Sequence, residues 1–200
     1  MATLILLVLG LAGCGAVVTP SPGATANPSP TTTAQPSAVA TGSSPGATSA
    51  VGIDGGLLKV LPPTVDGLAV AENAEAEAAA LDDPELPIVG TAMASGLAVD
   101  PTSGDFVYAI VVRLRPGAMT ADVFRDWRDT YDEGACSQAS GVAGNAEAQI
   151  DGRTVYIATC AGGVRTYHVW LDPQGMLISA SAVGDDRRLG ELLMNDLQVP

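Results

Sequence analysis

The chain has 200 residues and a formal net charge of −13, from 22 acidic and 9 basic side chains that all lie at Asp54 or beyond. Such an acidic protein repels nucleic acid and anionic lipid headgroups, so we expect no nucleic-acid partner. Residues 53–200 are numerous enough to bury a core of their own, and we expect one globular domain that needs no metal and no cofactor.

An apolar run opens the chain. Residues 4–11 are Leu, Ile and Val with one Gly, a run of signal-peptide length that is too short to span a bilayer. The stretch Leu11-Ala12-Gly13-Cys14 follows it and resembles the lipobox of bacterial lipoproteins. That resemblance implies that residues 1–13 are a cleaved signal peptide and that the Cys14 thiol carries a diacylglycerol.

Lipidation of Cys14 sets the expected location of the domain. Each buried methylene contributes about 0.8 kcal/mol, so two or three acyl chains hold a protein on a membrane almost irreversibly. We therefore expect a lipid-anchored domain on the extracytoplasmic side of the cell membrane. Met1-Ala2-Thr3 lacks the basic residue with which export signals normally begin. The alternatives to lipidation are an ordinary signal peptide with a chance cysteine and a buried amino-terminal strand.

A linker is predicted between the anchor and the domain. Residues 14–52 consist mainly of Ala, Ser, Thr, Pro and Gly and carry no charge. Such a composition has too little apolar surface to offset the entropy of ordering, so we expect a disordered stalk. As a flexible coil it would span roughly 30 to 35 Å.

The first part of the domain gives weak signals. Residues 57–61 are apolar except for Lys59 and predict either a short strand or a latch onto the core, and residues 67–70 predict another short strand. Residues 72–81 are rich in Ala and Glu, which favours a helix. Residues 85–98 are ambiguous between helix and strand.

Stronger signals begin at Asp105. Residues 106–114 are dominated by Val, Ile, Tyr and Phe and predict a buried strand. Thr120 is then placed to cap a helix, which has an apolar side at Val123, Phe124, Trp127 and Tyr131.

On the opposite side of that helix, the spacing predicts exposed i,i+4 ion pairs, Arg125 with Asp129 and Arg128 with Asp132.

Four strands and a closing helix are predicted next. The strands are 147–150, 153–160, 164–171 and 176–183, and the helix covers 185–197. Their short, turn-like connections favour antiparallel hairpins in a meander. The order predicts an α+β domain in which helices cover an antiparallel sheet. This order of elements is similar to that of the Mog1/PsbP-like fold, a resemblance that implies no function.

Cys136 and Cys160 are the two cysteines of the predicted domain. In an exported chain whose third cysteine is lipidated, each is the only partner for the other, and we expect a disulfide. The alternative is that one of them is a nucleophile or redox thiol acting with His168, the only histidine.

Residues 165–170 carry the most chemically versatile side chains of the chain. We single out Arg165, Tyr167, His168 and Trp170 as candidate ligand-binding residues. Strand alternation places Thr166, His168 and Trp170 on one face, with Arg165, Tyr167 and Val169 on the other. The alternative for this strand is structural: Trp170 in the core, with His168 at its edge.

No motif in the sequence identifies a reaction. There is no phosphate-binding loop, zinc-ligand spacing or nucleophile elbow. We expect a non-enzymatic envelope lipoprotein that binds a partner protein or a small ligand. A cell-surface hydrolase that uses His168 with a nearby carboxylate is the second hypothesis, and an envelope spacer is the third.

Overall fold

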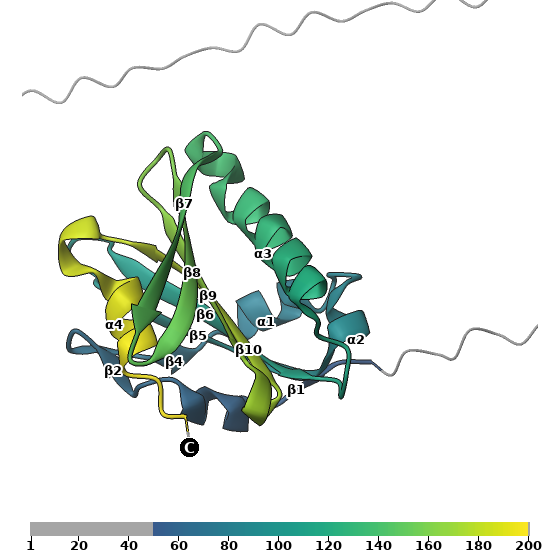
Figure 1. Ribbon diagram of the computed structural model, residues 1–200. Helices are drawn as coiled ribbons and strands as arrows, with labels where there is room; N and C mark the ends of the chain where they lie inside the picture. The colour runs from purple at the N-terminus through teal and green to yellow at the C-terminus, as the bar shows by residue number, and fades with distance from the viewer. Residues whose placement is uncertain (1–49, 200) are drawn as a thin grey trace, which may run out of the picture. The chain divides into compact units, whose positions relative to one another are not determined.

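The computed structural model describes residues 50–199 (Figure 1). The predicted signal peptide, Cys14 and nearly all of the predicted stalk lie outside these residues. None of the helices in the described part is long and apolar enough to cross a membrane.

Strands and helices alternate irregularly along the chain. The strands are β1 (Gly52–Ile53), β2 (Thr64–Val65), β3 (Leu68–Ala69), β4 (Ala71–Glu72), β5 (Gly90–Val99), β6 (Phe106–Leu114), β7 (Val142–Ile150), β8 (Arg153–Cys160), β9 (Arg165–Leu171) and β10 (Met176–Val183). The α-helices are α1 (Ala74–Ala80), α2 (Leu86–Val89), α3 (Ala121–Cys136) and α4 (Leu189–Asn195). Short 3₁₀ helices are η1 (Gly55–Val60), η2 (Ser137–Ala139), η3 (Asp172–Gln174) and η4 (Asp185–Arg187).

One sheet organises the domain. Its strand order is β1-β5-β6-β10-β9-β8-β7, and β4 also pairs with β5. Only β1 runs parallel to its neighbour, whereas every other pairing is antiparallel. Strands β7 to β10 form the predicted meander, and the α+β class is confirmed.

Both faces of the sheet are covered, because the central strands are apolar on both sides. In β6, Val107 and Val111 belong to one buried cluster, and Ile110 and Val112 belong to the other. Helices α3 and α4 lie on opposite sides of the sheet (Figure 1). Two layers of helix therefore enclose the antiparallel sheet.

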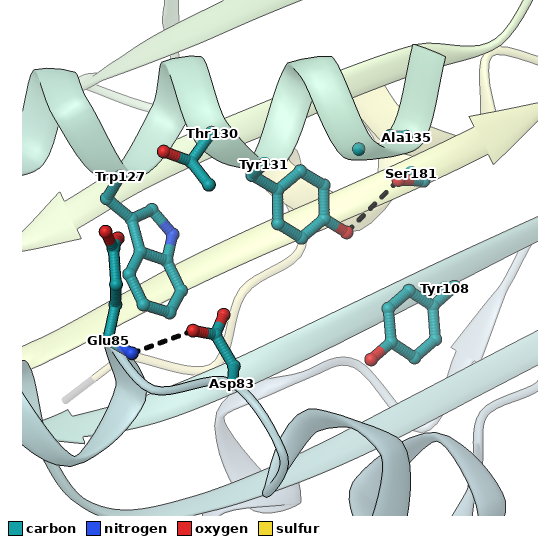
Figure 2. A pocket seen from close by; sticks show the side chains of 9 residues that line it. Asp83, Glu85, Tyr108, Trp127, Thr130, Tyr131, Ala135 and Ser181 are labelled. Carbon is teal, nitrogen blue, oxygen red and sulfur yellow. Dashed lines mark hydrogen bonds between the residues drawn. The ribbon is translucent and has the colours of Figure 1, made fainter. Parts of the chain in front are cut away.

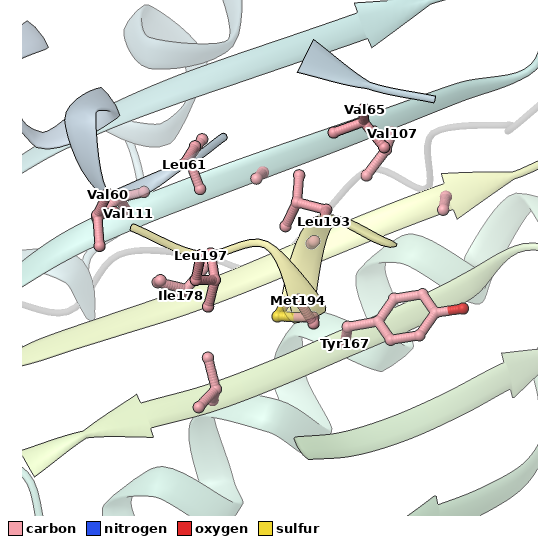
Figure 3. Close-up of a cluster of buried hydrophobic side chains, with 14 of the residues drawn as sticks. Val60, Leu61, Val65, Val107, Val111, Tyr167, Ile178, Leu193, Met194 and Leu197 are labelled. Atoms are coloured by element: carbon pink, nitrogen blue, oxygen red, sulfur yellow. The ribbon is translucent and has the colours of Figure 1, made fainter. Parts of the chain in front are cut away.

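Helix α4 and η1 cover the first face. Leu193, Met194 and Leu197 belong to one buried cluster with Val111 and Ile178 of the sheet (Figure 3). The predicted helix over 185–197 is interrupted at Arg188, whose φ of 53° lies in the left-handed region. The closing segment is thus a 3₁₀ turn followed by a short α-helix.

The structure decides between the alternatives that the sequence left open before Asp105, and it extends one predicted strand. Residues 57–61 form no strand, because Asp54 caps the 3₁₀ helix η1 by accepting a hydrogen bond from Gly56 N. Leu57, Val60 and Leu61 are buried, as the latch alternative requires. The ambiguous segment 85–98 contains both structures, α2 and then β5. Strand β7 starts at Val142, earlier than predicted.

Helix α3 covers the second face. Its predicted cap and its predicted apolar side are both confirmed. Thr120 Oγ1 accepts a hydrogen bond from Val123 N at 3.2 Å, and Phe124 and Trp127 are buried. The predicted ion pairs are wrong. Arg125 pairs with Asp122 at 2.8 Å.

The second predicted pair fails for a different reason. The Arg128 guanidinium stacks over the Tyr156 ring at 3.9 Å, while Asp132 is buried against the sheet. One side of α3 that looks solvated in the sequence is therefore partly internal.

Candidate functional site

The four candidate ligand-binding residues of β9 lie on both faces of the sheet, as strand alternation predicts. Arg165 and Tyr167 face α4, where both contact Glu191: Arg165 Nη1 lies 3.3 Å from Oε1, and Tyr167 Oη donates to Oε2 at 2.8 Å. His168 and Trp170 face α3. Because the sheet separates the two pairs, they do not form one binding site.

His168 is held inside the protein by two polar neighbours. Its Nε2 lies 2.9 Å from Asp132 Oδ1, and its Nδ1 lies 2.9 Å from Ser179 Oγ. Trp127 Nε1 in turn donates to Ser179 Oγ at 3.0 Å, and Thr166 Oγ1 donates to Asp132 Oδ1.

The direction of the hydrogen bonds in this network follows from its fixed donor and from the tautomer of His168. An indole N–H can only donate, so Ser179 Oγ accepts from Trp127, and with a neutral imidazole protonated at Nε2 the Ser179 hydroxyl donates to His168 Nδ1. His168 Nε2–H then donates to the Asp132 carboxylate. This is a serine, histidine and aspartate in line, the arrangement that activates a serine nucleophile in many hydrolases.

Burial opposes that chemistry here. The exposed fraction is 0% for Ser179, 1% for His168 and 7% for Asp132. A substrate carbonyl has no access to Ser179 Oγ, whose neighbours are Trp127 and His168 themselves. The network satisfies buried polar groups and fixes α3 on β9 and β10.

A cavity of about 490 Å³ opens beside this network, between α3 and the sheet (Figure 2). Helix α3 forms one wall, β6 and β10 form the floor, and the segment between α1 and α2 forms the rim. The lining residues are Asp83, Glu85, Tyr108, Trp127, Thr130, Tyr131, Gly134, Ala135 and Ser181.

Three aromatic rings dominate the cavity. Trp127 and Tyr131 project from α3 toward the sheet, and Tyr108 projects from β6 (Figure 2). The polar ends of the two helix residues are already bonded to the sheet: Trp127 Nε1 to Ser179, and Tyr131 Oη to Ser181 Oγ at 3.1 Å. Their carbon surfaces are what remains for the cavity, which is mostly apolar inside.

The tyrosines of the cavity stay neutral at physiological pH. Burial raises the pKa of the Tyr131 phenol above its ordinary value, although the Ser181 hydroxyl partly opposes this. Burial likewise raises the pKa of Tyr108. Neither ring brings a charge to the cavity, and neither is poised as an acid or base near neutral pH.

Negative charge comes instead from the rim. Asp83 and Glu85 flank Pro84 in the turn before α2, and Asp83 Oδ1 accepts a hydrogen bond from Glu85 N at 2.8 Å. This bond fixes the Asp83 carboxylate, and the Glu85 side chain lines the same cavity (Figure 2). The lining contains no Arg, Lys or His.

A second, smaller cavity of about 280 Å³ lies on the other side of α3. Asp132 borders it, so the buried network reaches this cavity through Asp132 and the aromatic cavity through Trp127. Arg128, whose guanidinium stacks on Tyr156, also lines it. Within residues 50–199, no cluster of His, Cys, Asp and Glu is arranged to hold a metal ion.

The disulfide prediction is confirmed. Cys136 and Cys160 form a disulfide, with their Cα atoms 5.1 Å apart. It joins the end of α3 to the end of β8, and neither cysteine lines either cavity. These two sulfurs are therefore unavailable as a nucleophile or redox pair with His168.

The residues that line the aromatic cavity were not predicted from the sequence. One usable signal was present: Ser179 and Ser181 stand two residues apart in an otherwise apolar strand, so both point to the same buried face. Buried hydroxyls require partners, and here those partners are Trp127, His168 and Tyr131. Asp83 and Glu85 carry no such signal, because they lie in an exposed turn.

Comparison with known proteins identifies no relative. No protein family matches the chain, and no curated protein and no solved structure matches it. The likeness to the Mog1/PsbP-like fold consequently stays a prediction.

Proposed function

We propose that this chain is an exported lipoprotein, anchored to the cell membrane through Cys14, whose domain binds a small ligand in the cavity between α3 and the sheet. The observation that carries the binding proposal is the cavity itself, about 490 Å³ in volume and walled by Trp127, Tyr131 and Tyr108. Small-molecule sites are concave, mostly apolar and of about 300–1,000 Å³.

The walls of this cavity are preorganised. Trp127 and Tyr131 are each bonded to a serine of β10, so their rings do not have to be ordered when a ligand arrives. A preformed site loses less side-chain entropy on binding than a flexible one. Ser179 and His168, the residues of the hydrolase alternative, do not line the cavity. Binding without turnover is the function that this geometry supports best.

A blocking variant tests the binding proposal. A Cβ built on Gly134 meets no neighbouring atom within 4 Å, so Gly134→Leu should be tolerated and should place a side chain at the cavity. A screen of small amphiphilic compounds by thermal shift should find stabilisers of the wild type, since a ligand at one hundred times its Kd adds about 2.7 kcal/mol. Gly134→Leu should lose this stabilisation.

The matched control is Gly144→Leu in β7, where the new side chain also meets open space and lies outside the cavity. It should respond to the ligands like the wild type. Ligands that stabilise Gly134→Leu as strongly as the wild type would contradict the proposed site, and so would a screen without any stabiliser.

The anchor is tested by the mass of the protein isolated from its cells. We expect the loss of residues 1–13, the gain of acyl chains on Cys14, and a further gain of two hydrogens on reduction of the disulfide. Cys14→Ser should abolish acylation and move the protein out of the membrane fraction. A chain that keeps residues 1–13 and a free Cys14 thiol would refute the anchor.

The second candidate is a cell-surface hydrolase, favoured by the chain of hydrogen bonds from Ser179 through His168 to Asp132. Under this alternative the wild type hydrolyses esters or amides, and Ser179→Ala and His168→Ala abolish turnover. Under the binding proposal the wild type shows no turnover, and His168→Ala, whose side chain does not line the cavity, still binds the stabilisers. The buried position of Ser179 supports the binding proposal.

A further inference from the structure

We propose that the cavity between α3 and the sheet selects an organic cation: a protonated or quaternary amine attached to an apolar chain or ring. This inference rests on the proposed function, because it names the chemical class of the ligand for that same cavity. It is carried by two features that lie together, the aromatic rings of the walls and the carboxylates of the rim.

The aromatic rings favour a cation over a neutral group of the same shape. A ring presents negative potential at its face, and a cation within about 6 Å of the ring centre gains roughly 0.5–2 kcal/mol, most at tryptophan. Trp127, Tyr131 and Tyr108 all border the cavity (Figure 2). The N–H of Trp127 and the hydroxyl of Tyr131 are bonded to the sheet, so these polar ends do not compete for the ligand.

The rim adds formal charge of the complementary sign. Asp83 and Glu85 border the cavity, and among the ion pairs of the described residues none involves either of them. Asp83 accepts a hydrogen bond from a backbone amide, which leaves its charge uncompensated by any basic side chain. An ammonium group at the mouth would meet both carboxylates.

The same features disfavour the other ligand classes. A carboxylate or phosphate ligand would meet two like charges and no basic lining residue, in a chain whose net charge is −13. A neutral apolar ligand would fit the walls but would gain nothing from the rim. The cavity accordingly combines an apolar site for the body of a ligand with an acidic site for its head.

Three compounds of one shape separate these classes. We would measure the binding of 4-phenylbutylammonium, 4-phenylbutan-1-ol and 4-phenylbutanoate to the full-length protein by calorimetry in low-salt buffer. We expect the ammonium compound to bind about tenfold more tightly than the alcohol, and the carboxylate not to bind measurably. Raising the salt concentration should reduce this preference, because the rim is exposed to solvent.

Two isosteric substitutions assign the preference to the rim. Asp83→Asn keeps an oxygen that can accept the hydrogen bond from Glu85 N, and Glu85→Gln keeps the volume of its side chain. Each should weaken ammonium binding about two- to threefold and leave alcohol binding unchanged. Asp172→Asn removes the same charge from an exposed position outside the cavity and should leave all three affinities unchanged.

Gly134→Leu then locates the site, because it should abolish binding of both the ammonium compound and the alcohol. If the two compounds bind equally and both are blocked by Gly134→Leu, the cavity is a ligand site but the cation proposal is wrong. If ammonium binding survives Gly134→Leu, or responds to Asp172→Asn as to Asp83→Asn, the cation binds the acidic surface at large and the proposal is equally wrong. If none of the three compounds binds, the cation proposal fails, and the separate compound screen decides the proposed function.

Discussion

At the scale of single residues, two serines of one strand have unequal roles. Ser179 Oγ contacts two buried groups, Trp127 Nε1 and His168 Nδ1, whereas Ser181 Oγ contacts only the hydroxyl of Tyr131. A buried polar group left without its partner costs more than the net value of the lost bond. The free energy of unfolding lost on replacing each serine therefore depends on how many buried groups lose their hydrogen-bond partner.

We predict that Ser179→Ala lowers the free energy of unfolding by about 2–3 kcal/mol, because it orphans an indole N–H and an imidazole nitrogen. Ser181→Ala, the same substitution two residues away, should cost about 1 kcal/mol. Urea denaturation of both variants at neutral pH measures the difference. Equal costs would show that the Trp127, Ser179 and His168 contacts do not act together.

Tyr131 makes stability depend on alkaline pH. Burial raises its pKa in the folded state, so above about pH 10 the unfolded chain loses the phenolic proton while the folded chain keeps it. The unfolded state then binds fewer protons, and the free energy of unfolding should fall by about 1.4 kcal/mol per pH unit from this residue. Below pH 10 it should contribute no slope.

Denaturation of the wild type and Tyr131→Phe between pH 8 and pH 11 tests this dependence. The variant should show a shallower decline above pH 10, although it is less stable at pH 8 through loss of the Ser181 contact. Burial also raises the pKa of Tyr167, so Tyr167→Phe should flatten the decline in the same way. Parallel curves for wild type and both variants would contradict the assignment.

At the scale of elements, the sequence predicts best where local chemistry is strong. Thr120 and the apolar spacing from Val123 to Tyr131 predict α3, because a helix cap and a periodic face are both local features. The prediction of one continuous helix over 185–197 was wrong, because the local pattern does not reveal the left-handed conformation of Arg188 that separates η4 from α4. Packing of α4 on the sheet decides where that helix begins.

Close contact between α4 and β9 gives a prediction at this scale. A Cβ on Gly190 would overlap the Tyr167 ring, whereas a Cβ on Gly134 in α3 meets open space. Gly190→Ala should therefore destabilise the domain by about 1–3 kcal/mol through overpacking. Gly134→Ala should stabilise it by about 0.5–1 kcal/mol, because alanine favours the helix. Thermal denaturation of both variants measures this, and a change of the same sign in both would refute the contact.

At the scale of the whole molecule, the disulfide acts on the unfolded chain as much as on the fold. Cys136 and Cys160 are 24 residues apart in sequence, and closing such a loop restricts the unfolded ensemble. We predict that Cys136→Ala with Cys160→Ala lowers the free energy of unfolding by about 3 kcal/mol. Wild-type protein unfolded in the presence of reductant should show the same loss, and reductant should not change the double variant.

The sequence by itself determined the fold class and, from Phe106 onward, the order of the strands and helices. Alternating apolar residues and short turns dictate antiparallel pairing between neighbours in the chain, so the meander from β7 to β10 follows from local patterns. The pairing of cysteines followed too, since the predicted domain contains only two. Strand alternation also separated His168 from Tyr167 correctly.

Only the tertiary structure decided the candidate site. Asp132 looks solvated by its spacing to Arg128, yet it is buried against His168 and Thr166 because α3 lies across β9 and β10. The aromatic cavity joins Asp83, Tyr108 and Tyr131 from three separate segments. No local sequence pattern predicts that these residues lie together. Their proximity depends on which face of the sheet each segment covers and on how closely α3 approaches the sheet.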